Sequence, residues 1–417
     1  MRKDVTQAPP LAGVHSVYEK ERGPTPRDRT WLRVGVAVAA VGWGANQFAP
    51  LLLMYRSELG LSASTVQATF GLYAVGLVPG LLLGGPVSDR HGRRRVVLPA
   101  LAASLLGTAL LIAGGSGVGW LFAGRLVSGL ASGAAFSAGA AWIKELSPAA
   151  RDGGASPGAR RVTVTMTAGF AAGPPVAGVL AQWGPAPTVL PYLPHLALLL
   201  IALPLLAGTP ETRTTHTPGP VRLYPRLPPG RMRTVVAPLA PWVFGSASIG
   251  LAYLPGLVGS RLAGHALVFS ACSAMLTALA GILVQPLVRR VDRPGSPRLL
   301  TTALGLVVAG LLVAAGAAAT YAPWLVAVAA FVLGAGYGAA QVCGLLEVQR
   351  LARPAELATL TALYQALSYL GFAAPFLLAA AQSAVPPGVL LLVAAGLAGL
   401  TLAWTRLHHN HTENNHD

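Results

Sequence analysis

Charged side chains are scarce in this chain. Asp, Glu, Lys and Arg make up 11% of its 417 residues, against about 25% in ordinary soluble domains. Hydrophobic residues reach 53%, and they recur along the whole length instead of gathering in one stretch. These values exclude both an average globular protein and a disordered chain.

Cysteine and acidic residues are also few. The two cysteines, Cys272 and Cys343, lie in apolar stretches, which excludes a disulfide-stapled scaffold and indicates small buried hydrophobic residues. The sequence contains fourteen acidic and thirty basic residues, so the net charge is +16. In a soluble protein a net positive charge favours nucleic-acid binding. Whether that interpretation applies here depends on where the basic residues lie along the chain.

Long hydrophobic runs dominate the sequence. A bilayer core about 30 Å thick needs roughly 20 apolar residues per helix, and twelve runs of about that length are present; Pro and Gly within them are tolerated in membrane helices. The predicted spans are 32–53, 64–85, 96–113, 119–143, 162–182, 189–207, 235–257, 266–287, 299–319, 323–346, 357–381 and 387–405. We therefore predict an all-α polytopic membrane protein with twelve transmembrane helices.

The basic residues sort onto one side of these spans. Cytoplasmic segments of membrane proteins carry excess Lys and Arg, and 27 of the 30 basic residues fall on the side that holds both termini. Arg56 and Arg261 fall on the other side, and Arg125 lies inside a span. We therefore predict a multi-pass plasma-membrane protein with both termini in the cytoplasm. Its charge reflects topology and contact with anionic membrane lipids, and we expect no nucleic-acid partner.

A hydrophilic connection divides the spans into six and six. We predict a disordered cytoplasmic tail over 1–30, a six-helix bundle over 31–207, a cytoplasmic linker over 208–234, a second six-helix bundle over 235–406 and a disordered cytoplasmic tail over 407–417. Gly133-Ala134-Ala135 in span four is echoed by Gly338-Ala339-Ala340 in span ten. The two bundles are therefore expected to be pseudo-repeats.

The loop between spans two and three carries the clearest motif. It reads Gly85-Pro86-Val87-Ser88-Asp89-Arg90-His91-Gly92-Arg93-Arg94-Arg95. We expect Gly85 to let two helices approach, Asp89 to pair or cap at the membrane surface, and Gly92 to permit a tight turn. An ordinary positive-inside loop with an incidental acid is the alternative.

This motif, G-x-x-x-D-R-x-G-R-R, resembles the signature of the major facilitator superfamily, and the resemblance covers about residues 31 to 406. It implies a transporter of two six-helix halves with a conformational latch formed by Gly85, Asp89, Arg90, Gly92, Arg93, Arg94 and Glu145. In this latch Asp89 and Arg93 would form a charge relay. Its partners would be Glu145 and the N-terminus of span eleven near Glu356.

Arg125 is the one basic residue within a span. A charge there costs at least a few kcal/mol and is functional by default, although an Arg that snorkels to the outer surface is the alternative. The stretch from Arg125 to Gly133 is similar to the span-four pattern of the family, which implies a role in proton coupling or in the cavity. Glu347, near the cytoplasmic end of span ten, is a second candidate for that role. His195 in span six titrates in a useful range, but its place near the span's end indicates an interfacial residue.

Span five contains a glycine and proline pattern. Gly169, Gly173, Pro174 and Gly178 in this span resemble the G-x-x-x-G-P-x-x-G-G pattern that marks exporters of the drug:proton antiporter type, with Ala177 standing where the family has Gly. Pro174 removes a backbone hydrogen bond and bends the helix, and the glycine spacing gives a smooth packing face. A kink without directional meaning is the alternative. Pro210-Glu211-Thr212 after span six also resembles the family.

Polar and aromatic residues near the midplane are candidates for the substrate cavity. They are Asn46, Gln47, Tyr73, Tyr253, Gln341, Tyr364, Gln365 and Tyr369. Each also fits a helix-packing role, because the sequence does not fix how the helices are rotated. Since all are uncharged, they suit an uncharged or weakly cationic amphipathic substrate.

These observations predict a secondary active transporter that exports small, mostly apolar compounds by alternating access in exchange for protons. An importer or facilitator of a neutral nutrient with the same fold is the alternative, and a polytopic membrane enzyme would need clustered His, Asp or Ser that the spans lack. The sequence contains no G-x-x-x-x-G-K-[ST] loop, so we expect neither ATP hydrolysis nor a cofactor. The expected partners are a small-molecule substrate, protons and membrane lipids, and we expect a monomer.

Overall fold

The computed structural model describes residues 29–147, 157–212, 230–293, 296–353 and 356–413. Within these ranges all regular structure is helical, and twelve helical segments are long and apolar enough to cross a membrane. The prediction of a twelve-span, all-α membrane protein is confirmed.

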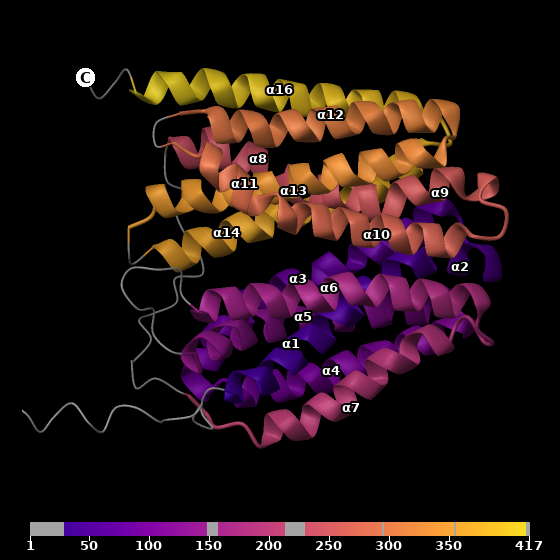
Figure 1. Cartoon of the computed structure of the whole chain (residues 1–417), viewed down its shortest axis with the longest axis vertical. Coiled ribbons are helices and arrows are strands. Elements are labelled where there is room, and N and C mark those ends of the chain that lie inside the picture. The colour runs from indigo at the N-terminus through magenta and orange to yellow at the C-terminus, as the bar shows by residue number, and fades with distance from the viewer. Residues whose placement is uncertain (1–28, 148–156, 213–229, 294–295, 354–355, 414–417) are drawn as a thin grey trace, which may run out of the picture.

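The helices form two bundles that lie side by side (Figure 1). The first contains α1 (Thr30–Asn46), α2 (Phe48–Glu58), α3 (Ala63–His91), α4 (Arg94–Ala113), η2 (Gly114–Ser116), α5 (Val118–Glu145), α6 (Pro157–Trp183), η3 (Leu190–Tyr192) and α7 (Leu193–Ala207). The second contains η4 (Met232–Val236), α8 (Ala237–Ser248), η5 (Ile249–Tyr253), α9 (Leu254–Val258), η6 (Gly259–Arg261), α10 (Ala266–Leu283), α11 (Gln285–Val291), α12 (Arg298–Thr320), α13 (Pro323–Leu351), α14 (Leu357–Tyr369), η7 (Leu370–Ala373), α15 (Ala374–Ala381) and α16 (Pro387–Glu413).

The internal repeat is visible in how the helices pack. A side chain at Gly133 of α5 would collide with the carbonyl oxygen of Leu77 on α3, the second span. A side chain at Gly338 of α13 would likewise collide with the carbonyl oxygen of Gly281 on α10, in the eighth span. The Gly-Ala-Ala sequence shared by spans four and ten therefore allows the same close helix contact in both halves.

Three spans are interrupted near the middle. The first is broken at Gln47, the seventh contains the π-helical turn η5, and the eleventh contains the 3-10 turn η7. Pro50, Pro255 and Pro375 follow these points. Because proline has no N–H and its ring clashes with the carbonyl four residues earlier, each one displaces the regular hydrogen-bond ladder just before it.

The bundle boundaries differ from the predicted ones at the C-terminus. Helix α16 extends to Glu413, so the prediction of a disordered tail is wrong for 407–413. This stretch contains neither Pro nor Gly to end the helix. The second half begins at η4, within the predicted linker. The predicted tail over 1–28, most of the linker (213–229) and the last four residues lie outside the described part of the chain.

We call the two faces of the molecule the basic end and the far end. The basic end holds the connection between α3 and α4 and the C-terminal part of α16; the far end holds the connections between α2 and α3 and between α9 and α10 (Figure 1). The halves meet where α10 packs against α6 and α2, and where α15 packs against α3.

Candidate functional site

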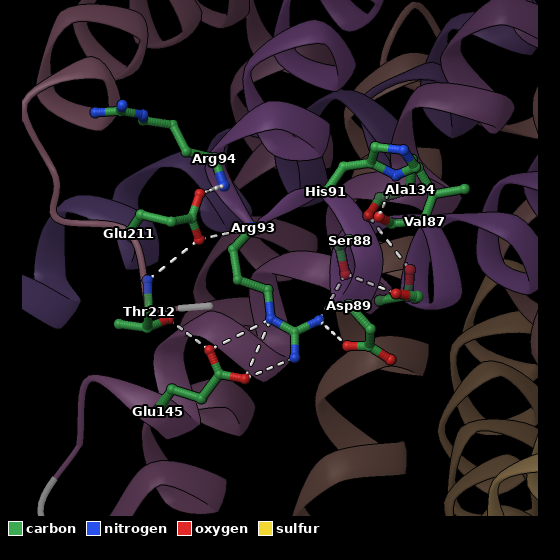
Figure 2. A network of polar contacts seen from close by, with 12 residues as sticks. Val87, Ser88, Asp89, His91, Arg93, Arg94, Ala134, Glu145, Glu211 and Thr212 are labelled. Carbon is green, nitrogen blue, oxygen red and sulfur yellow. Dashed lines mark hydrogen bonds and ion pairs between the residues drawn. The ribbon is translucent and has the colours of Figure 1, made fainter. Parts of the chain in front are cut away.

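Arg93 lies at the centre of a polar network at the basic end. Its Nη1 pairs with the Asp89 carboxylate and donates to Ser88 Oγ at 2.6 Å. On its other edge, Nε and Nη2 donate to Glu145 Oε1 at 3.1 and 2.6 Å. Figure 2 shows the guanidinium lying between the two carboxylates. The structure thus brings together Asp89 and Arg93 with Glu145, which lies 52 residues beyond Arg93.

Glu211 completes this network, although the sequence offered only the Pro-Glu-Thr resemblance as a signal. Its two carboxylate oxygens accept the backbone N–H groups of Arg93 at 2.7 Å and of Arg94 at 3.0 Å. These donors belong to the start of α4, which has no helical partner for them. An acid at a helix N-terminus is also favoured by the helix dipole, so Glu211 ties the end of the first bundle to the α3–α4 turn (Figure 2).

The electrostatics of the network keep Arg93 charged. Burial by itself would lower the pKa of the Arg93 guanidinium, but the contacts with Glu145 and Asp89 outweigh burial and raise that pKa. The Arg93 side chain is only 9% exposed, whereas Asp89 is 47% and Glu145 22% exposed. The network therefore consists of one buried permanent cation held by two carboxylates that water reaches.

Other predicted latch residues have different environments. Gly92 makes the tight turn with a positive φ of 104°, and the Arg94 side chain donates to the Ala207 carbonyl, while Arg90 is exposed. The expectation that Gly85 allows close helix approach is wrong, because its missing side chain faces open space; the neighbouring Gly84 packs on α5 instead. The expected contact of Asp89 with the N-terminus of span eleven is not among the interactions of the described residues.

A second ion-pair network lies at the basic end of the second half. Arg231 Nε donates to Glu347 Oε2 at 2.8 Å, and Arg350 contacts both Glu347 at 3.0 Å and Asp292 at 2.6 Å. Glu347, a predicted proton-coupling or cavity residue, is thus held by two arginines in this structure, because α13 ends beside the start of the second bundle.

We predict that Glu347→Gln destabilises the protein and does not uncouple it. Loss of the carboxylate leaves Arg231 and Arg350 close together without their shared anion. The cost should be about 1–3 kcal/mol, below that of a fully buried pair because Arg350 is 33% exposed. Thermal unfolding should shift downward, and gradient-driven and downhill transport should fall together. Selective loss of gradient-driven transport would contradict this assignment, and Glu356→Gln, at an exposed residue of the same end, is the control.

The glycines of α6 face two different neighbours. A side chain at Gly169 would collide with the backbone of Ala39 on α1. A Cβ at Gly173 would lie 2.7 Å from the carbonyl oxygen of Trp43, which also belongs to α1. A Cβ at Gly178 would instead lie 2.5 Å from the Cβ of Ala271 on α10. Gly169 and Gly173 therefore hold α6 within its own half, whereas Gly178 permits contact between the halves. Pro174 is buried beside Gly173.

We predict that Gly178→Val opens the contact between α6 and α10. The added side chain must push the halves apart, because Ala271 approaches too closely to accommodate it. In a background carrying Cys272→Ser and Cys343→Ala, Ala181→Cys is a reporter at a buried position one turn along α6. Its maleimide labelling should rise at least about tenfold, which corresponds to about 1.4 kcal/mol. Gly305→Val, which has open space around it, should leave the labelling rate unchanged, and an unchanged rate with Gly178→Val would contradict the contact.

The far end is closed by side chains that bond to the backbone of the opposite half. Gln67 Nε2 on α3 donates to the Ala252 carbonyl within η5 at 2.8 Å. Gln182 Oε1 on α6 accepts the backbone N–H of Leu267, in the first turn of α10, at 3.1 Å. Beside these bonds an open groove of about 730 Å³ lies between the halves, and Arg56, Glu58 and Gln182 are among its lining residues.

Arg125 is fully buried in the first half. Its guanidinium carbon lies 4.4 Å from the centre of the Tyr73 ring and 4.6 Å from that of Phe48. Full burial excludes the alternative in which this side chain reaches the outer surface. Its nearest hydrogen-bonding contact is a long one, 3.5 Å from Nη1 to the Ala45 carbonyl.

His195 is also buried, which corrects its interpretation as an interfacial residue. It is 1% exposed, with Nδ1 lying 2.8 Å from Thr108 Oγ1 and 3.3 Å from Gln47 Nε2. A side chain at Gly44 would collide with the imidazole. The glycine therefore makes room for His195 between α1, α4 and α7.

Two of the cavity candidates lie inside their own bundles in this structure. Gln47 is fully buried inside the first half, bonded to Trp43 and His195. Tyr364 is fully buried inside the second half, where its hydroxyl donates to the Ala340 carbonyl at 3.0 Å. Both are polar at the expected depth but point into their own bundle.

The other candidates lie nearer the boundary between the halves or remain partly exposed. Gln341 donates to Gln365 at 3.2 Å, and Tyr369 stacks on the ring of Phe244 with centroids 4.4 Å apart. Tyr73 lies beside Arg125 as described above. The remaining two make single contacts: Asn46 donates to the Phe170 carbonyl, and the Tyr253 hydroxyl donates to Gln382 at the far end.

The protein has twelve helical segments that can span a membrane, arranged in two repeated halves. The halves contact each other near the middle and at the far end. This is the architecture of a two-bundle integral membrane protein. The family model described as Major Facilitator Superfamily matches residues 34–375. The chain therefore belongs to the Major Facilitator Superfamily, as its α3–α4 motif predicted.

Curated relatives and a solved structure resemble this chain over different lengths. A chloramphenicol resistance protein of Pseudomonas aeruginosa is 24% identical over 283 residues, which cover 65% of this chain and 64% of that protein. A glucose transporter of Staphylococcus epidermidis is 28% identical over 107 residues, 26% of this chain and 24% of the relative. These matches thus span less than two thirds of either relative. A crystal structure of a POT family transporter in complex with 5-aminolevulinic acid superimposes with a TM-score of 0.72 at 12% identity, covering 91% and 94% of the two chains.

Proposed function

We propose that this protein exports small, mostly apolar compounds across the plasma membrane by alternating access, in exchange for protons. In this proposal the basic end faces the cytoplasm, in keeping with the excess of Lys and Arg there. The halves would rock about the fixed midplane site, and the monomer would be the working unit.

The observation that carries the proposal is the position of Gly178. The pattern on α6 resembles that of exporters, and its last glycine lies against α10 at the closed contact between the halves. A residue that controls this contact controls whether the far end opens, which is the step that releases an exported compound. The similarity to a chloramphenicol resistance protein supports the same direction.

Import of a neutral nutrient is the second candidate function. The similarity of 107 residues to a glucose transporter favours it. The two candidates differ in the direction of net flux and in the chemical class of the substrate, so one assay separates them.

The test uses a host that lacks its own efflux systems. Cells expressing the protein are screened with chloramphenicol and a panel of apolar toxic compounds for resistance and for cell-associated compound. Lower accumulation that a protonophore abolishes is the expected result. Faster glucose uptake without lower accumulation of any toxic compound would overturn the proposal in favour of import.

The matched control is Arg93→Ala at equal expression. Because the network around Arg93 lies away from the midplane, this variant should remain in the membrane while losing the transport cycle. Resistance that persists in Arg93→Ala cells, although the purified variant shows no substrate flux in liposomes, would show that the phenotype comes from expression of a membrane protein and not from transport.

A further inference from the structure

Arg125 carries a buried charge whose hydrogen-bonding capacity is mostly unused. Its side chain is 0% exposed, and its Nε and Nη2 atoms have no hydrogen-bond partner in the described structure. Rings of Phe48 and Tyr73 lie within 4.6 Å of the guanidinium, and cation–π contacts of this kind recover only part of the cost of burying a charge. The arrangement therefore lacks an anion.

The unused atoms form one edge of the guanidinium plane. Nε and Nη2 point the same way and together hold the two oxygens of a carboxylate. This chain uses that edge twice elsewhere: Arg93 holds Glu145 with it at 3.1 and 2.6 Å, and Arg231 holds Glu347 at 2.8 and 3.4 Å. The equivalent edge of Arg125 is matched to a carboxylate that the described part of the chain does not supply.

Aromatic rings continue from Arg125 into the second half. We define the aromatic array as Phe70, Tyr73, Phe244, Tyr369 and Phe372. Phe70 lies 5.9 Å from the Arg125 guanidinium, and its ring centre is 5.4 Å from that of Phe372. Phe372 in turn lies 5.2 Å from Phe244 and 5.9 Å from Tyr369. The array thus crosses the boundary between α3 and the second bundle.

Three rings of the array remain partly exposed although they contact one another. Phe244, Tyr369 and Phe372 are only half-buried, in contrast to Phe70 on α3. Because Phe70 and Phe372 belong to different halves, any separation of the halves parts their stacked faces. A flat aromatic group fits between these rings once they have separated far enough for it to stack on each of them, since an offset pair is favourable with ring centres about 4.5–7 Å apart.

We propose that Arg125 and the aromatic array bind aromatic carboxylates: the carboxylate on the Nε and Nη2 edge of Arg125, and the ring against the array. This deepens the proposed function, on which it rests for taking the protein as a carrier of amphipathic compounds. It replaces the uncharged or weakly cationic substrate expected from the sequence with an aromatic anion. A permanent organic cation is disfavoured at this site because it would meet an uncompensated buried positive charge.

Binding to the purified protein in lipid nanodiscs tests this without a gradient. Three probes share one ring system: 2-naphthoate, uncharged 2-naphthamide and cationic 2-naphthylmethyl-trimethylammonium. Equilibrium dialysis against empty nanodiscs corrects for partition into lipid. We expect 2-naphthoate to bind at least about tenfold more tightly than the cation. Equal or tighter binding of the cation overturns the proposal, and so does the absence of binding by 2-naphthoate.

Variants assign the binding to these side chains. Arg125→Gln should weaken 2-naphthoate at least about tenfold while changing 2-naphthamide little, and Phe372→Leu should weaken both. Phe331→Leu, on the exposed side of α13 at 51% exposure, should change neither. Full affinity of 2-naphthoate for Arg125→Gln overturns the proposal. Should that variant fail to fold, Arg125→Lys keeps the charge but loses the two-donor edge, and unchanged affinity there also overturns it.

The binding assay separates this inference from the proposed function. Carboxylate binding by a protein that exports none of the screened compounds would refute export and leave the site assignment standing. Export by a protein that prefers the cationic probe would support export and refute the site.

Discussion

Replacement of Arg93 by alanine is expected to reduce transport by at least about tenfold while the protein still inserts in the membrane. The substitution removes the cation that links Asp89 on α3 with Glu145 on α5. The carboxylates then repel each other at the basic end, and the relative stability of the transporter's conformations changes. Initial rates of substrate flux in liposomes, normalised to the amount of reconstituted protein, measure the effect.

Two further variants define the cause of this loss. Arg95→Ala removes an exposed arginine from the same turn and should transport at the unmodified rate, which separates the network from the general basic charge of this end. Arg93→Lys should recover only part of the rate, because an ammonium cannot replace the fork that contacts both carboxylates. Wild-type flux in Arg93→Ala would show that the network is not a latch.

A leucine at Gly173 is expected to prevent stable folding of the first half. Its Cβ alone would lie 2.7 Å from the Trp43 carbonyl oxygen, and a backbone atom cannot move aside as a flexible side chain does. Overpacking costs about 1–3 kcal/mol where the neighbouring side chains can move, and the cost is larger here because the neighbouring atom belongs to the backbone. Size-exclusion chromatography and thermal unfolding in detergent should show little folded protein.

The matched control is Gly316→Leu on α12, where no neighbouring atom lies within 4 Å; it should behave as the unmodified protein. Gly173→Ala should give an intermediate unfolding temperature, because it adds only the Cβ. If Gly173→Leu remains monodisperse with an unchanged unfolding temperature, α1 and α6 do not pack as described.

The sequence was sufficient where neighbours in space are also neighbours in the chain. The turn at Gly92 follows from the local sequence, and the pairing of Asp89 with Arg93, four residues apart, was implied by the resemblance of the α3–α4 motif to the family signature. Glu211, however, is 118 residues from Arg93, and Arg231 is 116 residues from Glu347. Hydropathy places such residues at the correct end of the bundle, but only the packing of the helices brings them into contact.

Rotation of the helices explains the remaining errors. Consecutive residues on a helix point about 100° apart, so Gly84 packs on α5 while Gly85 faces open space. Gln47 and Tyr364 have the depth expected of cavity residues but face their own bundles. His195 was misplaced because its burial depends on the space left by Gly44, a contact between helices that no pattern within either segment indicates.

The hydrogen bonds that Gln67 and Gln182 make across the far end determine how much water must bind when that end opens. Gln67 satisfies the Ala252 carbonyl in η5, and Gln182 satisfies an amide in the first turn of α10. Lipid tails cannot replace either partner, so each group must acquire water when the halves separate there. Opening of the far end is thus an uptake of solvent, and osmolytes excluded from the protein surface should slow it even when no substrate is present.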